Sequence, residues 1–199
     1  MASSSSVYGS VPDLPKREAM PTLPVSPYAV SKLAAEAYCR SWFDLYGLET
    51  VALRYFNVYG PRQRPDSAYA AVIPLFTRAL RTGARPIVHG DGGQSRSFAY
   101  IDDVVAANLA AATAPAEACS GKAYNIGGSR RSTLLELLDE LGAILGVDVD
   151  PEHTAPRAGD IRHSFADITA AARDLGWQPK VSLAEGLRHT VDWFALRGV

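Results

Sequence analysis

Two side chains near the start of the chain, Tyr28 and Lys32, have the types and the spacing of a proton-transfer pair. They stand four residues apart, and on a helix this spacing places the phenol and the ammonium group on one face, one turn apart. A nearby cation favours the phenolate, as does the positive potential at a helix N-terminus, so such a tyrosine can act as a general base. The same spacing also arises by chance, joining a packed tyrosine and a solvated lysine, so the surrounding sequence must decide.

The residues around this pair predict the helix that would position it. Ser26 is a typical N-cap, Pro27 a typical first helical residue and Gly47 a typical helix stop. Between them, over residues 28–46, apolar side chains recur with helical periodicity. We expect this helix to bury a face made of Val30, Leu33, Ala34, Ala37 and Leu45.

Segments typical of strands and of helices alternate along the rest of the chain. Residues 49–55 are typical of a buried strand. Further strands are expected at 86–89 and 123–126, and further helices at 71–81, 101–113, 133–145, 167–175 and 183–196. This alternation predicts an α/β protein with a parallel sheet.

Composition and charge exclude several classes of protein. The net charge of the 199 residues is −1, so no basic field points to nucleic acid or to an anionic membrane. No apolar run is long enough for a membrane-spanning helix, and the Ser-rich start lacks the basic and apolar regions of a signal peptide. Cys39 and Cys119 lack CxxC spacing, which predicts reduced thiols and a cytoplasmic protein. The four histidines show no ligand spacing with cysteines or carboxylates, so no metal site is expected.

Several motifs in a fixed order change the interpretation of the tyrosine–lysine pair. Residues 3–9 are SSSSVYG, residues 26–32 are SPYAVSK and residues 54–60 are RYFNVYG. Further along come SRSFAYIDDV at 95–104, YNIG at 124–127 and RAGD at 157–160. Together, over nearly the whole chain, they resemble the extended short-chain dehydrogenase/reductases, the NAD-dependent nucleotide-sugar epimerase/dehydratase family. The resemblance implies the C-terminal part of a Rossmann-like doubly wound parallel sheet plus a smaller α/β substrate domain.

The resemblance assigns the proton-transfer chemistry to three residues. It implies that Tyr28 takes the proton of the sugar C4 hydroxyl, that Lys32 assists it and holds the nicotinamide ribose of NAD, and that Ser4 bonds the same sugar oxygen. Ser5 and Ser6 occupy the places where the 4,6-dehydratases of the family carry an Asp–Glu pair that eliminates water, which argues against a dehydratase. Without the motifs, the serine run would be interpreted as a flexible loop.

The other matched residues are expected to line the cofactor and the substrate. Arginines offer a fork of donors that suits a diphosphate, and the family uses two of them. The implied set is Tyr55 (cofactor or core), Asn57, Arg96 and Arg157 (diphosphate), Asp160 (nucleotide ribose), Ala71 and Val72 (uracil), and Ser5, Ser6, Gln63 and Ser164 (around the sugar C2 group). Taken singly, these residues would more often be surface charges, turn caps or core residues.

One part of the family pattern is missing from the sequence. The family opens with a strand, a glycine-rich GxxGxxG turn and a helix that hold the NAD pyrophosphate, and the nearest candidate, GDGG at 90–93, opens no convincing helix. We therefore expect a partial Rossmann-like domain over 1–60 and a mainly nucleotide-sugar-binding domain over 61–199, from which 101–113 packs back on the first sheet. The resemblance implies NAD as the cofactor, although the glycine-rich turn that would bind its pyrophosphate is absent from these residues.

The implied reaction is NAD-dependent C4 epimerisation of a UDP-hexose, UDP-glucose/galactose or their N-acetyl forms, through a 4-keto intermediate. The resemblance also implies a homodimer when the protein is full length, and no activity is expected of these 199 residues alone. The alternatives are a UDP-sugar decarboxylase or dehydratase of the same family, which would want acidic residues beside Ser4, and a noncatalytic fragment that binds UDP-sugar.

Overall fold

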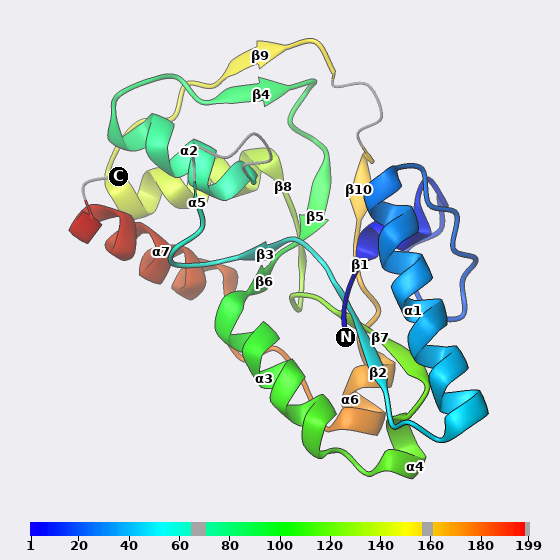
Figure 1. Cartoon of the computed structure of the whole chain (residues 1–199). Helices are drawn as coiled ribbons and strands as arrows, with labels where there is room; N and C mark the ends of the chain where they lie inside the picture. Colours follow the sequence, from blue (N-terminus) through cyan, green and yellow to red (C-terminus); the bar gives the residue numbers. More distant parts are fainter. Residues whose placement is uncertain (65–70, 157–160, 198–199) are drawn as a thin grey trace.

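The computed structural model describes residues 1–64, 71–156 and 161–197, and it contains a three-stranded parallel sheet (Figure 1). Its strand order is β1 (Ala2–Ser4), β2 (Val51–Tyr55) and β7 (Lys122–Ile126), and its last paired residues are Ser4, Tyr55 and Ile126. Parallel strands need crossover connections, and α1 (Pro27–Tyr46) joins β1 to β2. Serine is the N-cap of α1, proline its first residue and Gly47, at φ 69°, its left-handed end.

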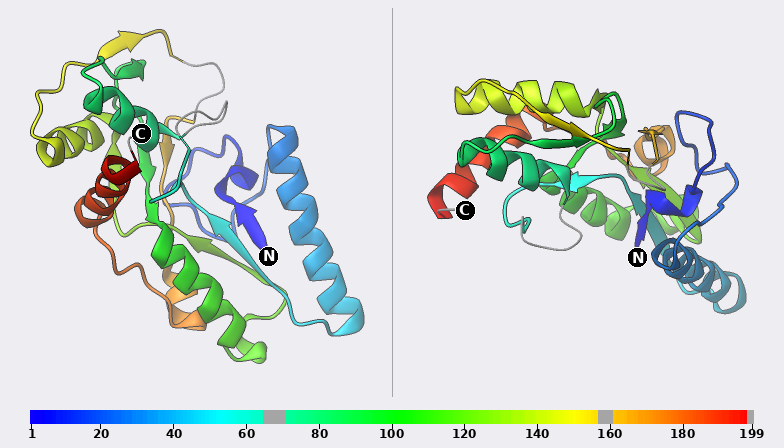
Figure 2. Two further views of the ribbon diagram at one scale, coloured as in Figure 1. Left: turned by 60° about the vertical axis from the view of Figure 1, so that its left-hand side comes forward. Right: turned by 90° about the horizontal axis from the view of Figure 1, so that it is seen from above.

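Side chains along β2 point alternately to the two faces of the sheet, and helices cover both faces. Val51, Leu53 and Tyr55 pack in an apolar cluster with α3 (Ile101–Thr113) and α6 (Thr169–Leu175). Arg54, which lies between them in sequence, points to the opposite face and pairs with Glu36 of α1. The left view of Figure 2 shows α1 on one side of the sheet and α3 and α6 on the other. The predicted α/β class with a parallel sheet is confirmed.

A second group of strands lies beyond the carboxyl ends of the first sheet (Figure 1). Here β5 (Ser95–Ser97) runs between β10 (His163–Ser164) and β8 (Arg131–Thr133), and β4 (Ile87–His89) pairs with β9 (Glu152–Thr154). With them, α2 (Val72–Arg81), α5 (Leu134–Leu145) and α7 (Leu183–Arg197) build a separate apolar core. The chain returns to the first sheet through α3 and α6, so it crosses between the two cores more than once.

Every helix and strand expected from the sequence is present, with bounds within two residues of the expected ones. Among the described helices, none has the length and the apolar character needed to cross a membrane. The elements that sequence analysis missed are short: η1 (Ser5–Tyr8), α4 (Ala116–Cys119) and several two- or three-residue strands, among them β3 (Val58–Tyr59) and β6 (Ala99–Tyr100). Such elements have too few residues for a periodic pattern.

The expected buried face of α1 is wrong in part. Val30 and Leu45 are 52% and 72% exposed, and Ala34 and Ala37 are exposed as well, so only Leu33 of the five packs inward. The buried positions of α1 are Ala29 and a charged residue, Glu36, so its inner face is not marked by large apolar side chains. A search for apolar periodicity therefore selects the solvent-exposed apolar residues of the helix, its outer stripe. That outer stripe continues along the helix through three more exposed side chains, Tyr38, Trp42 and Tyr46.

Candidate active site

The serine run closes β1 and turns directly into η1. Ser4 is the N-cap of η1: its side chain accepts a hydrogen bond from the Ser6 amide at 3.2 Å, and the Ser6 hydroxyl lies 2.9 Å away. This run is an ordered turn, and it places Ser4, Ser5 and Ser6 at the carboxyl end of a parallel strand. Ligands of open α/β sheets bind at this edge.

Tyr28 and Lys32 lie on α1 beside this strand end. Ser26 caps the helix by accepting from the Ala29 amide at 3.2 Å, which fixes the first turn where Tyr28 stands. Lys32 Nζ lies 5.7 Å from the centre of the Tyr28 ring and donates to the Ala2 carbonyl of β1 at 3.1 Å. The Tyr28 side chain is 56% exposed, so solvent or a ligand can reach it. The predicted one-face arrangement of the pair is confirmed.

The structure places Tyr55 on the other side of the sheet from this pair. The Tyr55 ring packs with the α3 and α6 cluster, and its hydroxyl donates to Asn108 Oδ1 of α3 at 2.9 Å. Asn57 follows two residues later and turns toward β5, where its amide donates to the Ser97 carbonyl at 3.3 Å. Tyr55 therefore does not lie near Tyr28 and Lys32, whereas Asn57 lies between the two groups of strands.

Arg96 and Ser164 face each other on neighbouring strands, β5 and β10. The Arg96 guanidinium donates to the carbonyls of Ser95 and Arg162 at 3.0 Å each. Burial lowers the pKa of His163, and the charges of Arg131, Arg162 and Arg96 lower it further. Three arginines therefore lie around β5 and β10, one of them, Arg162, paired with Asp91, and this excess of positive charge is of the kind that attracts anions.

The remaining predicted substrate residues lie on loops and on the start of α2. Gln63 donates to the Val58 carbonyl at 3.1 Å, Ala71 is the N-cap of α2, and Val72 packs on the second core. Arg157 and Asp160, predicted for the diphosphate and the ribose, lie outside the described residues. Their placement therefore stays a prediction from sequence.

Two contacts join the serine turn to the strand that carries Ser164. Ala166, two residues after Ser164, packs in one apolar cluster with Val7, Tyr8 and Phe56. The chain around Ala166 also forms a parallel bridge with Lys16, in the loop that follows the serine turn. The serine turn, which carries Ser4, is thus packed against the chain that follows Ser164.

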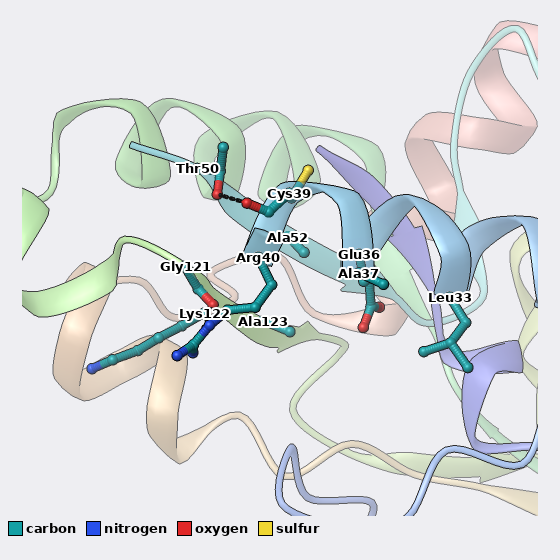
Figure 3. Close-up of a pocket in the computed structure, with 10 residues that line it drawn as sticks. All are labelled: Leu33, Glu36, Ala37, Cys39, Arg40, Thr50, Ala52, Gly121, Lys122 and Ala123. Atoms are coloured by element: carbon teal, nitrogen blue, oxygen red, sulfur yellow. Dashed lines mark hydrogen bonds between the residues drawn. The ribbon is translucent and has the colours of Figure 1, made fainter. Parts of the chain in front are cut away.

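A cavity of about 280 Å³ lies elsewhere (Figure 3). It opens between the middle of α1 and the amino-terminal halves of β2 and β7, and its lining includes Leu33, Cys39, Thr50 and Lys122. None of the predicted site residues lines it. Ligands of parallel sheets bind at carboxyl ends, whereas this cavity lies toward the amino-terminal ends of β2 and β7, away from Ser4 and Tyr28. Among the described residues, no group of three or more His, Cys, Asp or Glu side chains could hold a metal ion.

Sequence analysis missed a buried polar network directly behind the site. Arg54 is almost fully buried, and it contacts Glu36 of α1 and the Tyr8 hydroxyl. Burial opposes its charge, but the hydrogen bonds and charges of Glu36 and Tyr8 prevail and raise the pKa of Arg54. The available signal was a charged residue inside an otherwise apolar strand, because such a residue must find a partner.

Comparison with known proteins identifies relatives of this fold and site. The NAD dependent epimerase/dehydratase family matches residues 1–127. A UDP-glucose 4-epimerase of Mycolicibacterium smegmatis is 40% identical over 97% of this chain and 60% of its own length. A dTDP-glucose 4,6-dehydratase of Streptomyces niveus is 34% identical over 96% of this chain and 55% of its own length.

Solved structures agree with the sequence relatives. The UDP-glucose 4-epimerase of Thermotoga maritima with UDP-glucose superimposes with a TM-score of 0.93 and 40% identity, over 100% of this chain and 63% of the other. The UDP-N-acetylglucosamine 4-epimerase of Methanobrevibacter ruminantium, in complex with UDP-N-acetylmuramic acid, gives a TM-score of 0.92 and 41% identity, over 98% and 62%. The chain thus spans about 60% of the length of the relatives it matches.

Proposed function

Because the chain belongs to the NAD-dependent epimerase/dehydratase family, we propose that it carries the catalytic residues of a UDP-hexose 4-epimerase. The observation that carries the proposal is the tyrosine–lysine pair on α1, held against the serine-bearing strand by the Lys32 hydrogen bond to the Ala2 carbonyl. Relatives that are 4-epimerases by name, at about 40% identity, support the same reaction.

The residues at this edge fit the nicotinamide end of NAD. The ammonium group of Lys32 has three donors and gives one to the Ala2 carbonyl, which leaves donors for the ribose hydroxyls. When bound, NAD would supply the hydride acceptor and donor for C4 of the sugar. The two glycine pairs of the described chain, within 90–93 and at 127–128, each lead into a strand, β5 or β8, rather than into a pyrophosphate-binding helix. We therefore propose that the isolated 199 residues do not retain NAD and are inactive.

Each catalytic residue of this chain has one task in the reaction. Tyr28, as phenolate, takes the proton from the sugar O4 while Ser4 hydrogen-bonds the same oxygen, and Lys32 stabilises the phenolate. Together with loss of the C4 hydride, for which bound NAD would be the acceptor, this would give a 4-keto sugar. When the keto sugar presents its other face, Tyr28 returns the proton to O4 and the C4 configuration is inverted.

The serine turn favours epimerisation over dehydration or decarboxylation. Elimination of water needs an acid and a base beside the reacting carbons, and Ser5 and Ser6 offer only hydroxyl groups. Two alternatives are tested beside it. One is a dehydratase or decarboxylase, since a relative is a dehydratase by name, and the other is a noncatalytic protein that binds UDP-sugar. Product mass decides between them: an epimer has the mass of its substrate, a dehydratase product lacks one water, and a decarboxylase product lacks carbon dioxide.

The experiment uses a fusion that provides an NAD-binding segment. The amino-terminal part of the Thermotoga maritima relative that this chain does not cover is joined ahead of Met1. NAD content, product mass and C4 configuration are then measured with UDP-glucose and UDP-galactose. Interconversion of the two sugars supports the proposal, whereas loss of water, loss of carbon dioxide or binding without turnover by a folded, NAD-containing protein contradicts it.

We propose that the substrate range includes UDP-N-acetylglucosamine. Ser164, opposite Arg96 and half-buried, is a small side chain where a tyrosine ring would fill the space beside the sugar C2 group. Gln63 and the serine hydroxyls offer hydrogen bonds to an acetamido group. In the fusion, Ser164→Tyr should lower kcat/KM for the acetamido sugar relative to UDP-glucose, and an unchanged ratio would mean that Ser164 only ends the β10 strand.

We also propose that the full-length protein is a homodimer. The outer stripe of α1, with Tyr38, Trp42, Leu45 and Tyr46 exposed, is an apolar surface of the kind that subunits bury. Sedimentation of the fusion at several concentrations tests this, with Trp42→Glu as the variant expected to shift it to monomer.

A further inference from the structure

A chain of five buried polar side chains runs behind the proposed site. Ser3 donates to Glu36, Glu36 pairs with Arg54, Arg54 Nη1 lies 2.9 Å from the Tyr8 hydroxyl, and that hydroxyl donates to Asn125 Oδ1 at 2.7 Å. Each of the five residues is at most 8% exposed. The Glu36–Arg54 pair is bidentate, with Nη2–Oε2 at 2.7 Å and Nε–Oε1 at 3.0 Å.

Each of these residues stands next to a segment that carries the site. Ser3 directly precedes Ser4 on β1, and Glu36 is one helical turn beyond Lys32 on the same face of α1. At the far end, Asn125 Nδ2 donates to the Lys16 carbonyl at 2.9 Å and to the Asp167 carbonyl at 3.2 Å. The network therefore touches β1, α1 and the chain that follows Ser164.

Stability alone does not account for such a network. A buried ion pair recovers little beyond the cost of removing its charges from water, and apolar side chains of similar size often stabilise a fold as well or better. Directional hydrogen bonds do what apolar contacts cannot, because they fix the relative position and rotation of the groups they join. The position of α1 depends on such hydrogen bonds, because its sheet-facing side is poor in large apolar side chains. Only Ala29 and Glu36 of this helix are buried.

We propose that Glu36 and Arg54 are positioning residues, which hold the α1 face bearing Tyr28 and Lys32 in register with the strand bearing Ser4. Figure 3 shows Glu36 on the side of α1 that lines the cavity above β2. The inference rests on the proposed function for its catalytic meaning, but the geometry it describes, Lys32 Nζ against the Ala2 carbonyl, is measurable without turnover.

The test replaces both partners at once. Glu36→Met/Arg54→Met leaves no unpaired charge in the interior, and removing the desolvation cost of the pair offsets the loss of the acceptor for the Ser3 hydroxyl, so its melting temperature should stay close to that of the wild type. A matched control removes an exposed pair from the same helix, Arg40→Gln/Asp44→Asn, whose side chains lie 2.7 Å apart in solvent. All three proteins are the 199-residue chain.

The first readout is the acetylation rate of Lys32 under limiting acetic anhydride, resolved by mass spectrometry, with Lys180 of the same molecule as internal reference. The second is amide hydrogen exchange in peptides covering 1–9 and 26–36. At unchanged melting temperature, the double methionine variant should acetylate Lys32 faster and exchange both segments about tenfold faster, because local opening controls exchange. The exposed-pair control should match the wild type in both.

Two outcomes overturn the inference. One is a double methionine variant that keeps both its melting temperature and the wild-type rates, which would show that apolar packing positions α1 equally well. The other is a variant whose exchange rises uniformly over the chain, which is general loosening. In the fusion, the same variant should lose turnover about 10–100-fold at similar KM. A folded wild-type fusion without epimerase activity would refute the proposed function, and the acetylation and exchange rates would still decide this inference.

Discussion

Asn125 allows a stability prediction whose size can be worked from its hydrogen bonds. Asn125→Leu keeps the branching of the side chain but deletes its three hydrogen bonds, to the Tyr8 hydroxyl and to the carbonyls of Lys16 and Asp167. The Lys16 carbonyl keeps the Asp167 amide at 2.8 Å, so two groups lose a partner: the Tyr8 hydroxyl proton and the Asp167 carbonyl. At about 1–3 kcal/mol for a buried group left unpaired, with the partly buried Asp167 carbonyl at the low end, the loss should be about 2–4 kcal/mol.

Urea unfolding followed by circular dichroism measures this loss. Asn108→Leu is the matched control, because Asn108 also accepts a hydrogen bond from a tyrosine, Tyr55, at 2.9 Å, but on the exposed side of α3. Water can replace that bond, so the control should change the free energy of unfolding by no more than about 0.5 kcal/mol. A loss below about 1 kcal/mol for Asn125→Leu, or equal losses for the two variants, would refute the reasoning from burial.

Three further variants test the site and the surface charges. In the NAD-containing fusion, Tyr28→Phe should lower kcat by about 10²–10⁴ while UDP-sugar binding stays, and a near-normal kcat would mean that another group is the base. Arg96→Ala should weaken UDP binding by about 2–5 kcal/mol in calorimetry, since it removes a charged donor from the diphosphate, and unchanged affinity would place Arg96 outside the substrate site. The hydrogen bonds of Arg173 and Tyr124 hold the pKa of Asp174 well below its usual value. Its carboxylate therefore stabilises the fold above pH ~4, and this contribution fades as pH falls further. Asp174→Asn should accordingly be less stable than the wild type at pH 7 in urea titrations, with a difference that shrinks toward pH 2; a constant difference would contradict this.

The sequence predicted the elements that have a clear period or clear ends. The Ser26–Pro27 start and the Gly47 stop fixed α1 almost to the residue, and the apolar strands and helices followed the same logic. The tyrosine–lysine geometry was predictable too, since it depends only on the helical spacing of Tyr28 and Lys32.

The tertiary contacts of polar residues were not predictable in the same way. Glu36 resembles a surface residue in the sequence of a helix, and only the structure shows that it lies opposite Arg54 of β2. For the same reason the outer stripe of α1 was mistaken for its inner face: helical periodicity identifies a stripe, but not which surface covers it. The orientation of Tyr55 depends on strand alternation together with the position of α3, which one sequence does not supply.

Conversion of UDP-galactose by the fusion tests the central claim, that Tyr28 is the base of a UDP-hexose 4-epimerase. The wild-type fusion and its Tyr28→Phe variant are compared at equal NAD content and equal melting temperature, with UDP-glucose formation followed over time. The account predicts UDP-glucose from the wild type and a rate lower by about 10² or more from the variant. A folded, NAD-containing wild type that forms no UDP-glucose, or a variant that forms it at the same rate, would contradict the account.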